Sequence, residues 1–297
     1  EAMMATMLSI TNPKDKVVIF SPFYENYGAD TILSGAEPIY VPLVPPDFTF
    51  SIEQLENAFK QGAKALILCN PSNPCGKVFT FEELTAIADV VKKYDAYVVT
   101  DEVYEHIVYA PNKHIYMQAL DGMRERTIVC NSLSKTYSIT GWRLGYVIAN
   151  PEIIDRVKKV HDFLTVGAAA PLMEAATVGL KFDDKYYDEL AAHYAHMKEV
   201  FVGGLEKLGL KYTDPQGAYY VLVDVSEFGV KDDVKFCEWL AQYVGVAAVP
   251  GSSFFREDVH NLIRFHFAKQ DDTLNEAINR LAGLRKAVAE AGDVEWR

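Results

Sequence analysis

The order of apolar and helical segments constrains the fold of this chain more than any other feature. Through the first two thirds of the sequence, apolar runs of strand length alternate with stretches of helical periodicity. Polar residues do not recur at every second position of these runs, which is typical of parallel strands covered on both faces. The sequence therefore predicts an α/β fold, in which helices sandwich a mainly parallel sheet. The predicted strands are residues 16–20, 38–43, 64–69, 96–100, 127–130 and 144–149.

The helices predicted between these strands begin at recognisable signals. Ser51 with Gln54, and Thr80 with Glu83, have the spacing of a capping box, which satisfies free N–H groups in the first turn of a helix. These signals place one helix start after the apolar run at 38–43 and another after the run at 64–69. The predicted helices are residues 24–34, 51–60 and 81–94.

The chain opens directly on helix-forming residues, from Glu1 to about Ile10. No Ser, Thr, Asp or Asn precedes them to cap the exposed N–H groups. We therefore expect an N-terminal part of the protein to be missing from this sequence, and the first domain to be incomplete.

The pattern changes after Pro151, where helices come in succession and strands become sparse. This change predicts a second, smaller α+β domain, with a large domain at residues 1–195 and the small one at residues 196–297. In this part we expect helices at residues 151–163, 171–180, 184–208 and 232–243, strands at 218–224, 246–249 and 262–267, and a final helix from Thr273.

Charge and cysteine content exclude several classes of function. Of the 297 residues, 29 are Lys or Arg and 41 are Asp or Glu, which gives a net charge of −12. Nucleic acids and anionic membrane surfaces would repel such a chain, so we expect neither as a partner. Four cysteines are too few for a disulfide framework and fit no zinc spacing, which favours a reducing cytoplasm.

Polar residues gather where three predicted strands end. The strand at 64–69 leads into Asn-Pro-Ser-Asn-Pro-Cys-Gly (70–76), the strand at 96–100 into Asp-Glu-Val-Tyr (101–104), and the strand at 127–130 into Asn-Ser-Leu-Ser-Lys (131–135). Ligands bind beyond the carboxyl ends of strands in open α/β sheets. One crevice would then hold an amide, a carboxylate, a phenol, hydroxyls, a lysine and Arg143. This set suits pyridoxal phosphate (PLP), which needs a lysine, an acid and hydrogen-bond donors to its phosphate.

Four motifs in this order carry a resemblance to a known family. Residues 132–146 (Ser-Leu-Ser-Lys-Thr-Tyr-Ser-Ile-Thr-Gly-Trp-Arg-Leu-Gly-Tyr) are similar to the PLP-lysine signature of the class I and II aminotransferases. The segments 70–76 and 101–104 resemble that family's Asn-Pro-x-Asn-Pro-x-Gly and Asp-Glu-x-Tyr motifs, and Arg264 interrupts an apolar strand as the family's arginine does. The chain thus resembles fold-type I PLP enzymes of the aspartate, aromatic and kynurenine aminotransferase kind, over essentially its whole length.

The resemblance implies a catalytic role for three residues. Lys135 would form a Schiff base with PLP and move a proton between the substrate and the cofactor. Asp101 would pair with the pyridinium nitrogen, and Tyr104, with Asn73, would donate hydrogen bonds to the cofactor's 3′-oxygen. Asn73 would also face the substrate.

The remaining cofactor and substrate contacts are implied in the same way. Ser132, Ser134 and Arg143 would hold the phosphate, and Tyr24 would stack on the cofactor ring. Arg264 would bind the substrate α-carboxylate through two parallel hydrogen bonds, a geometry that only a guanidinium offers.

The function that these residues imply is amino-group transfer between an L-amino acid and a 2-oxo acid by a ping-pong cycle, in a homodimer with shared active sites. Two alternatives remain open: a C–S β-lyase of the same fold, and an inactive PLP-fold fragment. We expect no metal site, because His193 and His196 stand three residues apart on a predicted helix without further ligands at metal-like spacing. The sequence does not select the amino acid.

Overall fold

The computed structural model describes residues 1–292 and 294–297 and contains two β-sheets. The larger sheet has the strand order β2-β1-β3-β4-β5-β6. Its first five strands run parallel, and only β6 is antiparallel to its neighbour β5. The α/β fold with a mainly parallel sheet is therefore confirmed. The strands are β1 (Lys16–Ser21), β2 (Glu37–Pro42), β3 (Ala63–Cys69), β4 (Tyr97–Asp101), β5 (Thr127–Ser132) and β6 (Gly145–Ile148).

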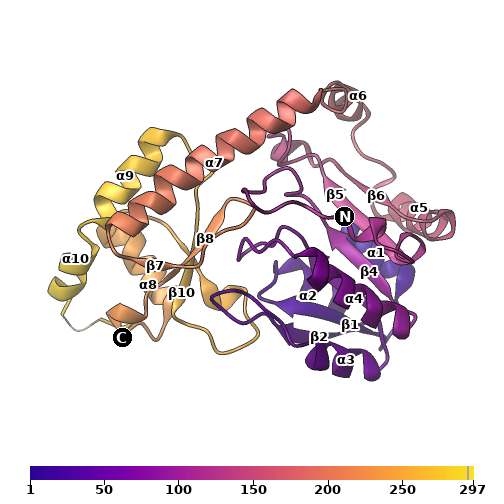
Figure 1. Cartoon of the computed structure of the whole chain (residues 1–297), viewed down its shortest axis with the longest axis horizontal. Helices are drawn as coiled ribbons and strands as arrows, with labels where there is room; N and C mark the ends of the chain where they lie inside the picture. Colours follow the sequence, from indigo (N-terminus) through magenta and orange to yellow (C-terminus); the bar gives the residue numbers. More distant parts are fainter. Residues whose placement is uncertain (293) are drawn as a thin grey trace.

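Helices cover both faces of this sheet, as Figure 1 shows. Alternate residues of one strand enter different hydrophobic cores: Val18 packs in one core, and Val17 in the other. The first core includes α3 (Ile52–Lys60) and α4 (Phe81–Lys93). The second includes side chains from α1 (Ala2–Ile10), α2 (Asn26–Leu33) and α5 (Pro151–Thr165). Burial on both sides explains why these strands lack alternating polar residues.

The predicted helix starts are found in the structure. Thr80 and Glu83 form a complete capping box at α4. At α3, Ser51 Oγ accepts a hydrogen bond from the Gln54 N–H, 3.3 Å away. Helix α1 has no side-chain cap at Glu1, as expected from the sequence.

A 24-residue helix, α7 (Asp184–Lys207), runs from α6 (Ala170–Gly179) beside the larger sheet to the second sheet (Figure 1). The second sheet is antiparallel, with the order β7-β8-β10-β9. The predicted domain boundary at residue 195 falls within α7, and the division at that residue stays a prediction. The elements of this part are β7 (Lys211–Tyr212), β8 (Tyr220–Asp224), α8 (Asp233–Trp239), β9 (Val249–Pro250), β10 (Leu262–His266), α9 (Asp271–Leu281) and α10 (Leu284–Glu290).

Three predicted elements of this part are wrong in extent. The strand expected at 246–249 is reduced to β9, which pairs with β10 at two positions only. The helix expected at 232–243 is α-helical to Trp239 and continues as a π-helix through residues 240–244. The single final helix that the sequence predicts is interrupted at Gly283 and forms two helices, α9 and α10.

The second half of the chain is hydrogen-bonded to the loops that leave the larger sheet. Gly217 N–H donates to the Gly76 carbonyl (2.8 Å), and Ala218 N–H donates to the Ile107 carbonyl (2.8 Å). A Cβ on Gly217 would lie 2.8 Å from Pro71 Cβ, so only glycine allows this close approach. These contacts fix the start of β8 against the ends of the parallel strands.

Within the described part of the chain, no helix combines the length and the apolar character required to cross a membrane.

Candidate active site

Asp101 stands at the carboxyl end of β4, in the middle of the larger sheet. It pairs in register with Cys69 of β3 and Cys130 of β5, so the three strands end side by side. Tyr27 Oη donates a hydrogen bond to Asp101 Oδ2 (2.7 Å), and the Val103 N–H donates to Oδ1 (3.2 Å). Burial raises the pKa of Asp101, and these two hydrogen bonds oppose that rise by stabilising the carboxylate. The site therefore holds a buried acid with an oriented carboxyl group.

Lys135 lies in the loop that follows β5. Its side chain is half-buried, and Nζ lies 5.8 Å from the centre of the Tyr219 ring. The charge of Lys135 also acts to lower the pKa of Asp101, against the larger effect of burial, so the two groups lie near each other. Ser138 and Arg143 in this loop have left-handed backbone conformations (φ 55° and 56°), a strain that is common where a loop holds functional side chains.

Tyr104 and Tyr220 join the two sheets at this site. Tyr104 lies in the turn that follows Asp101, is 3% exposed, and has its Oη 2.9 Å from Tyr220 Oη of β8. Burial raises the pKa of both phenols, that of Tyr220 to about 12, so both are neutral donors at neutral pH.

Arg264 of β10 lies between two aromatic rings. Its guanidinium carbon is 4.3 Å from the ring centres of both Tyr220 and Phe254, and its Nη1 donates to Asn73 Oδ1 (2.6 Å). Stacking holds the guanidinium plane, while its other N–H groups can donate to a ligand. Asn73 and Arg264, 191 residues apart, thus form one unit.

Ser132 and Ser134 form a tight turn at the end of β5. Ser132 Oγ lies 2.7 Å from Ser134 Oγ and accepts a hydrogen bond from the Ser134 N–H (3.1 Å). Arg143 is exposed, and its guanidinium donates to the Thr140 carbonyl of its own turn (2.9 Å). The structure therefore places the two hydroxyls together and leaves Arg143 on the same loop with its charge facing solvent.

Tyr24 precedes α2, and its ring contacts the Tyr27 ring edge-on, with centres 5.7 Å apart. Burial raises the pKa of the Tyr24 phenol, the negative charges of Glu25 and Asp101 raise it further, and Arg143 opposes them. Tyr24 is 37% exposed, so its ring is partly open to a ligand. The structure thus brings Tyr24 near Asp101, because Tyr27 contacts both residues.

Sequence reasoning missed four aromatic residues of this site: Tyr27, Tyr219, Tyr220 and Phe254. In the helix predicted at residues 24–34, Tyr27 follows Tyr24 by three residues and so falls on the same face, which could have indicated it. The other three lie in the second half of the chain, and their approach to Asp101, Lys135 and Arg264 depends on how the two sheets meet.

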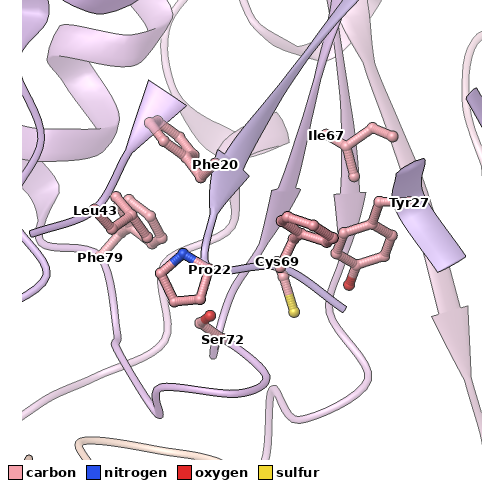
Figure 2. A pocket seen from close by; sticks show the side chains of 9 residues that line it. Phe20, Pro22, Tyr27, Leu43, Ile67, Cys69, Ser72 and Phe79 are labelled. Carbon is pink, nitrogen blue, oxygen red and sulfur yellow. The ribbon is translucent and has the colours of Figure 1, made fainter. Parts of the chain in front are cut away.

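A small cavity of about 10 Å³ with a mainly apolar lining lies next to the site, and Tyr27 and Cys69 are among the residues that line it (Figure 2). This volume is about the size of one water molecule. Burial raises the pKa of the Cys69 thiol far above its ordinary value, so Cys69 stays protonated. Cys69 is thus a packing residue here.

Comparison with known proteins identifies the class to which this site belongs. The family model described as aminotransferase class I and II matches residues 2–281, and the chain therefore belongs to that family. It is 35% identical to a probable N-succinyldiaminopimelate aminotransferase of Mycobacterium tuberculosis over 97% of this chain and 76% of that protein. The methionine aminotransferase of Escherichia coli is 33% identical over 96% of this chain and 74% of its own length.

A solved structure agrees with the sequence comparison. The structure of N-succinyldiaminopimelate aminotransferase from Mycobacterium tuberculosis superposes with a TM-score of 0.92 at 35% identity, over 95% of this chain and 75% of that one. The family and its fold are PLP-dependent. The chain is thus an aminotransferase of the PLP fold-type I class.

The residues present fit this cofactor. Asp101 is a buried carboxylate of the kind that pairs with a protonated ring nitrogen, and Lys135 supplies an amine near it. The paired hydroxyls of Ser132 and Ser134 are suitable phosphate ligands.

The hydrogen bond from Tyr27 to Asp101 gives a first prediction. Tyr27→Phe removes the donor and leaves the carboxylate less stabilised, because hydrogen bonds to charged groups contribute about 1.5–3 kcal/mol. We expect kcat/KM for amino-group transfer to fall about tenfold and the PLP dissociation constant to rise. Tyr243→Phe, at a tyrosine that is 65% exposed in the other part of the chain, is the matched control and should change neither value. Unchanged kinetics in Tyr27→Phe would show that this contact does not tune Asp101.

Proposed function

We propose that this protein transfers the amino group of an L-amino acid to a 2-oxo acid in two alternating half-reactions on PLP bound at Lys135. The observation that carries this proposal is that Lys135 lies near the buried Asp101. Arg264 stacks on Tyr220, whose hydroxyl group lies 2.9 Å from that of Tyr104 in the turn after Asp101. When bound, PLP supplies an electrophilic carbon for the amino group and a ring that withdraws electrons from the substrate Cα.

Each residue would act through the chemistry of its own side chain. Lys135 Nζ would attach the cofactor and, once displaced by the substrate amine, would carry a proton to or from the substrate Cα. Asp101 would hold a proton on the ring nitrogen, while the neutral Tyr104 phenol and the Asn73 amide would donate to the cofactor's 3′-oxygen. The phosphate would be bound by Ser132 and Ser134, together with Arg143 from the same loop. Tyr24 would cover the cofactor ring.

Substrate binding would rest on Arg264. Its guanidinium plane is fixed by Tyr220 and Phe254, so the order needed to bind a carboxylate exists before the substrate arrives. Amino acids and 2-oxo acids share the α-carboxylate, so one Arg264 would serve both half-reactions. Asn73, bonded to the same guanidinium, would orient it toward the cofactor.

A product assay tests this function against its alternatives. The holoenzyme is incubated with a mixture of L-amino acids, with and without a 2-oxo acid, and amino acids, keto acids and thiols are quantified. Transamination predicts that an amino acid is consumed in proportion to the acceptor added. Release of pyruvate and a thiol from cysteine conjugates without an acceptor would show a C–S β-lyase, and no turnover would show an inactive chain.

We also propose that the protein forms a homodimer through the α5–α6 region. Several apolar side chains of this region are exposed, which is uncommon on a monomer surface: Phe163 is 91%, Val166 80%, Val178 61% and Leu180 59% exposed. Sedimentation equilibrium should give twice the chain mass of 33.3 kDa, and Phe163→Glu should lower it. A single chain mass at all concentrations would contradict the proposal.

A cytoplasmic location is proposed on the basis of the cysteines. All four are free thiols in the structure, and three of them are buried. Fractionation of cells that express the protein tests this location, and recovery outside the cytoplasmic fraction would refute it.

A further inference from the structure

Three titratable side chains meet behind the candidate active site: Glu102, Glu105 and His114. One ligand atom from each lies within 4.8 Å of the others. Glu102 directly follows Asp101, but its side chain is 2% exposed and pairs with His114. Glu105 is 13% and His114 6% exposed. None of the three has a role in the function proposed above.

The charges of this cluster are not balanced by the usual partners. Within the described residues, the two carboxylates pair only with histidines: Glu102 with His114 (3.5 Å) and Glu105 with His106 (3.7 Å). Neither forms an ion pair with a lysine or an arginine there. Buried carboxylates are costly unless they are paired or bind a metal ion.

The distances suit a shared ion better than direct hydrogen bonds. The 3.5 Å between His114 Nε2 and Glu102 Oε2 lies beyond the normal range of a nitrogen–oxygen hydrogen bond. Two ligands each bound at about 2.1 Å in a tetrahedral site stand about 3.4 Å apart. His114 Nδ1 is also buried and has no hydrogen-bond partner in the described structure. An ion bound at Nε2 would satisfy the ring nitrogen that faces Glu102, while Nδ1 would keep its proton.

The surroundings hold one ligand in place. Asn131 Nδ2 donates to Glu105 Oε1 (2.7 Å), and the Tyr116 ring packs edge-on against His114, with centres 4.6 Å apart. Such hydrogen bonds to a ligating carboxylate are typical of metal sites. We propose that Glu102, Glu105 and His114 bind one divalent transition-metal ion, since imidazole with carboxylates selects zinc-like ions rather than calcium or magnesium.

This ion would have a structural role. Glu102 directly follows β4, and His114 lies in the loop between β4 and β5. Asn131, which holds Glu105, is the second-last residue of β5, so the ion would connect this loop to the ends of both strands. The Asn131 side chain also accepts the Ser132 N–H (2.7 Å), which connects the metal site to the hydroxyl turn. Sequence spacing does not indicate this site, because the ligand positions 102, 105 and 114 match no standard metal motif.

Titration of the PLP-loaded full chain with Zn²⁺ alone tests the proposal, without any substrate. We expect one saturable site per chain with micromolar or tighter affinity, and a higher Tm in the presence of Zn²⁺, because a ligand that binds only the folded state stabilises it. Glu105→Gln and His114→Gln should each weaken Zn²⁺ binding at least tenfold. Circular dichroism checks that each variant is folded. If one of the two variants does not fold, the other still tests the site.

His196→Gln is the matched control. His196 forms an exposed pair with Asp271 (2.9 Å) on the second part of the chain, and its loss should leave the affinity unchanged. Absence of saturable binding up to about 1 mM Zn²⁺ would overturn the proposal. Equal affinity in wild type, Glu105→Gln and His114→Gln would overturn it as well, because the ion would then bind elsewhere.

Discussion

Lys135→Ala is expected to abolish amino-group transfer, with a loss of kcat of at least about 10³-fold, while the fold is retained. Proton transfer by a positioned side chain accounts for about 10²–10⁴-fold in rate, and this lysine would also attach the cofactor. The fold should persist, because the Lys135 side chain is half-buried and its aromatic contact, at 5.8 Å from the Tyr219 ring centre, is weak. Steady-state turnover and circular dichroism together check both parts of this prediction.

Two further variants separate the roles of Lys135. Lys135→Arg keeps the positive charge beside Asp101 but cannot attach the cofactor aldehyde, so it should be as inactive as the alanine variant. Lys185→Ala removes a lysine of α7 that is 77% exposed, and it should have normal turnover. Near-normal turnover in Lys135→Ala would refute the assignment of this lysine.

Arg264→Lys is expected to raise KM for amino acids and 2-oxo acids alike, by about 10–100-fold. Lysine keeps one positive charge but loses the planar fork that binds a carboxylate through two parallel hydrogen bonds. It also cannot stack in the same way between Tyr220 and Phe254, which lie 4.3 Å from the guanidinium carbon. Because the cofactor residues are untouched, kcat should change much less than KM.

Arg280→Lys is the matched control for this prediction. Arg280 lies on α9, far along the chain from the cofactor motifs. Its guanidinium donates to Glu276 of the same helix (2.8 Å) and to the Gly245 carbonyl (2.9 Å). This substitution should leave both KM values unchanged. An Arg264→Lys enzyme with unchanged KM, or with a higher KM for only one of the two substrate classes, would remove Arg264 from the shared carboxylate site.

The parallel sheet and the edge that carries the site could be predicted from the sequence, because both follow from local patterns. Continuous apolar runs require cover on both faces, and the carboxyl ends of neighbouring parallel strands meet at one edge. This rule predicts that Asp101 and Lys135 share a crevice, and in the structure the charge of Lys135 acts on the Asp101 carboxyl group. Their catalytic roles stay predictions until activity is measured.

The parts that could not be predicted depend on contacts between distant segments. The Arg264–Asn73 hydrogen bond joins residues 191 positions apart, and the rings around Arg264 come from β8 and from the loop before β10. The cluster of Glu102, Glu105 and His114 forms because the segment after β4 folds back on itself, which no spacing rule anticipates. Short strands such as β9 also escape prediction, since two paired residues leave no periodic pattern.

The measurement that tests the account most directly is the visible absorption spectrum of the purified protein with added PLP. The account predicts an absorption band of lysine-linked cofactor that is absent in Lys135→Ala. An L-amino acid mixture should bleach this band to the aminated form of the cofactor, and a 2-oxo acid should restore it. A chain that binds PLP but shows no band dependent on Lys135, or a band that an L-amino acid leaves unchanged, would contradict the account.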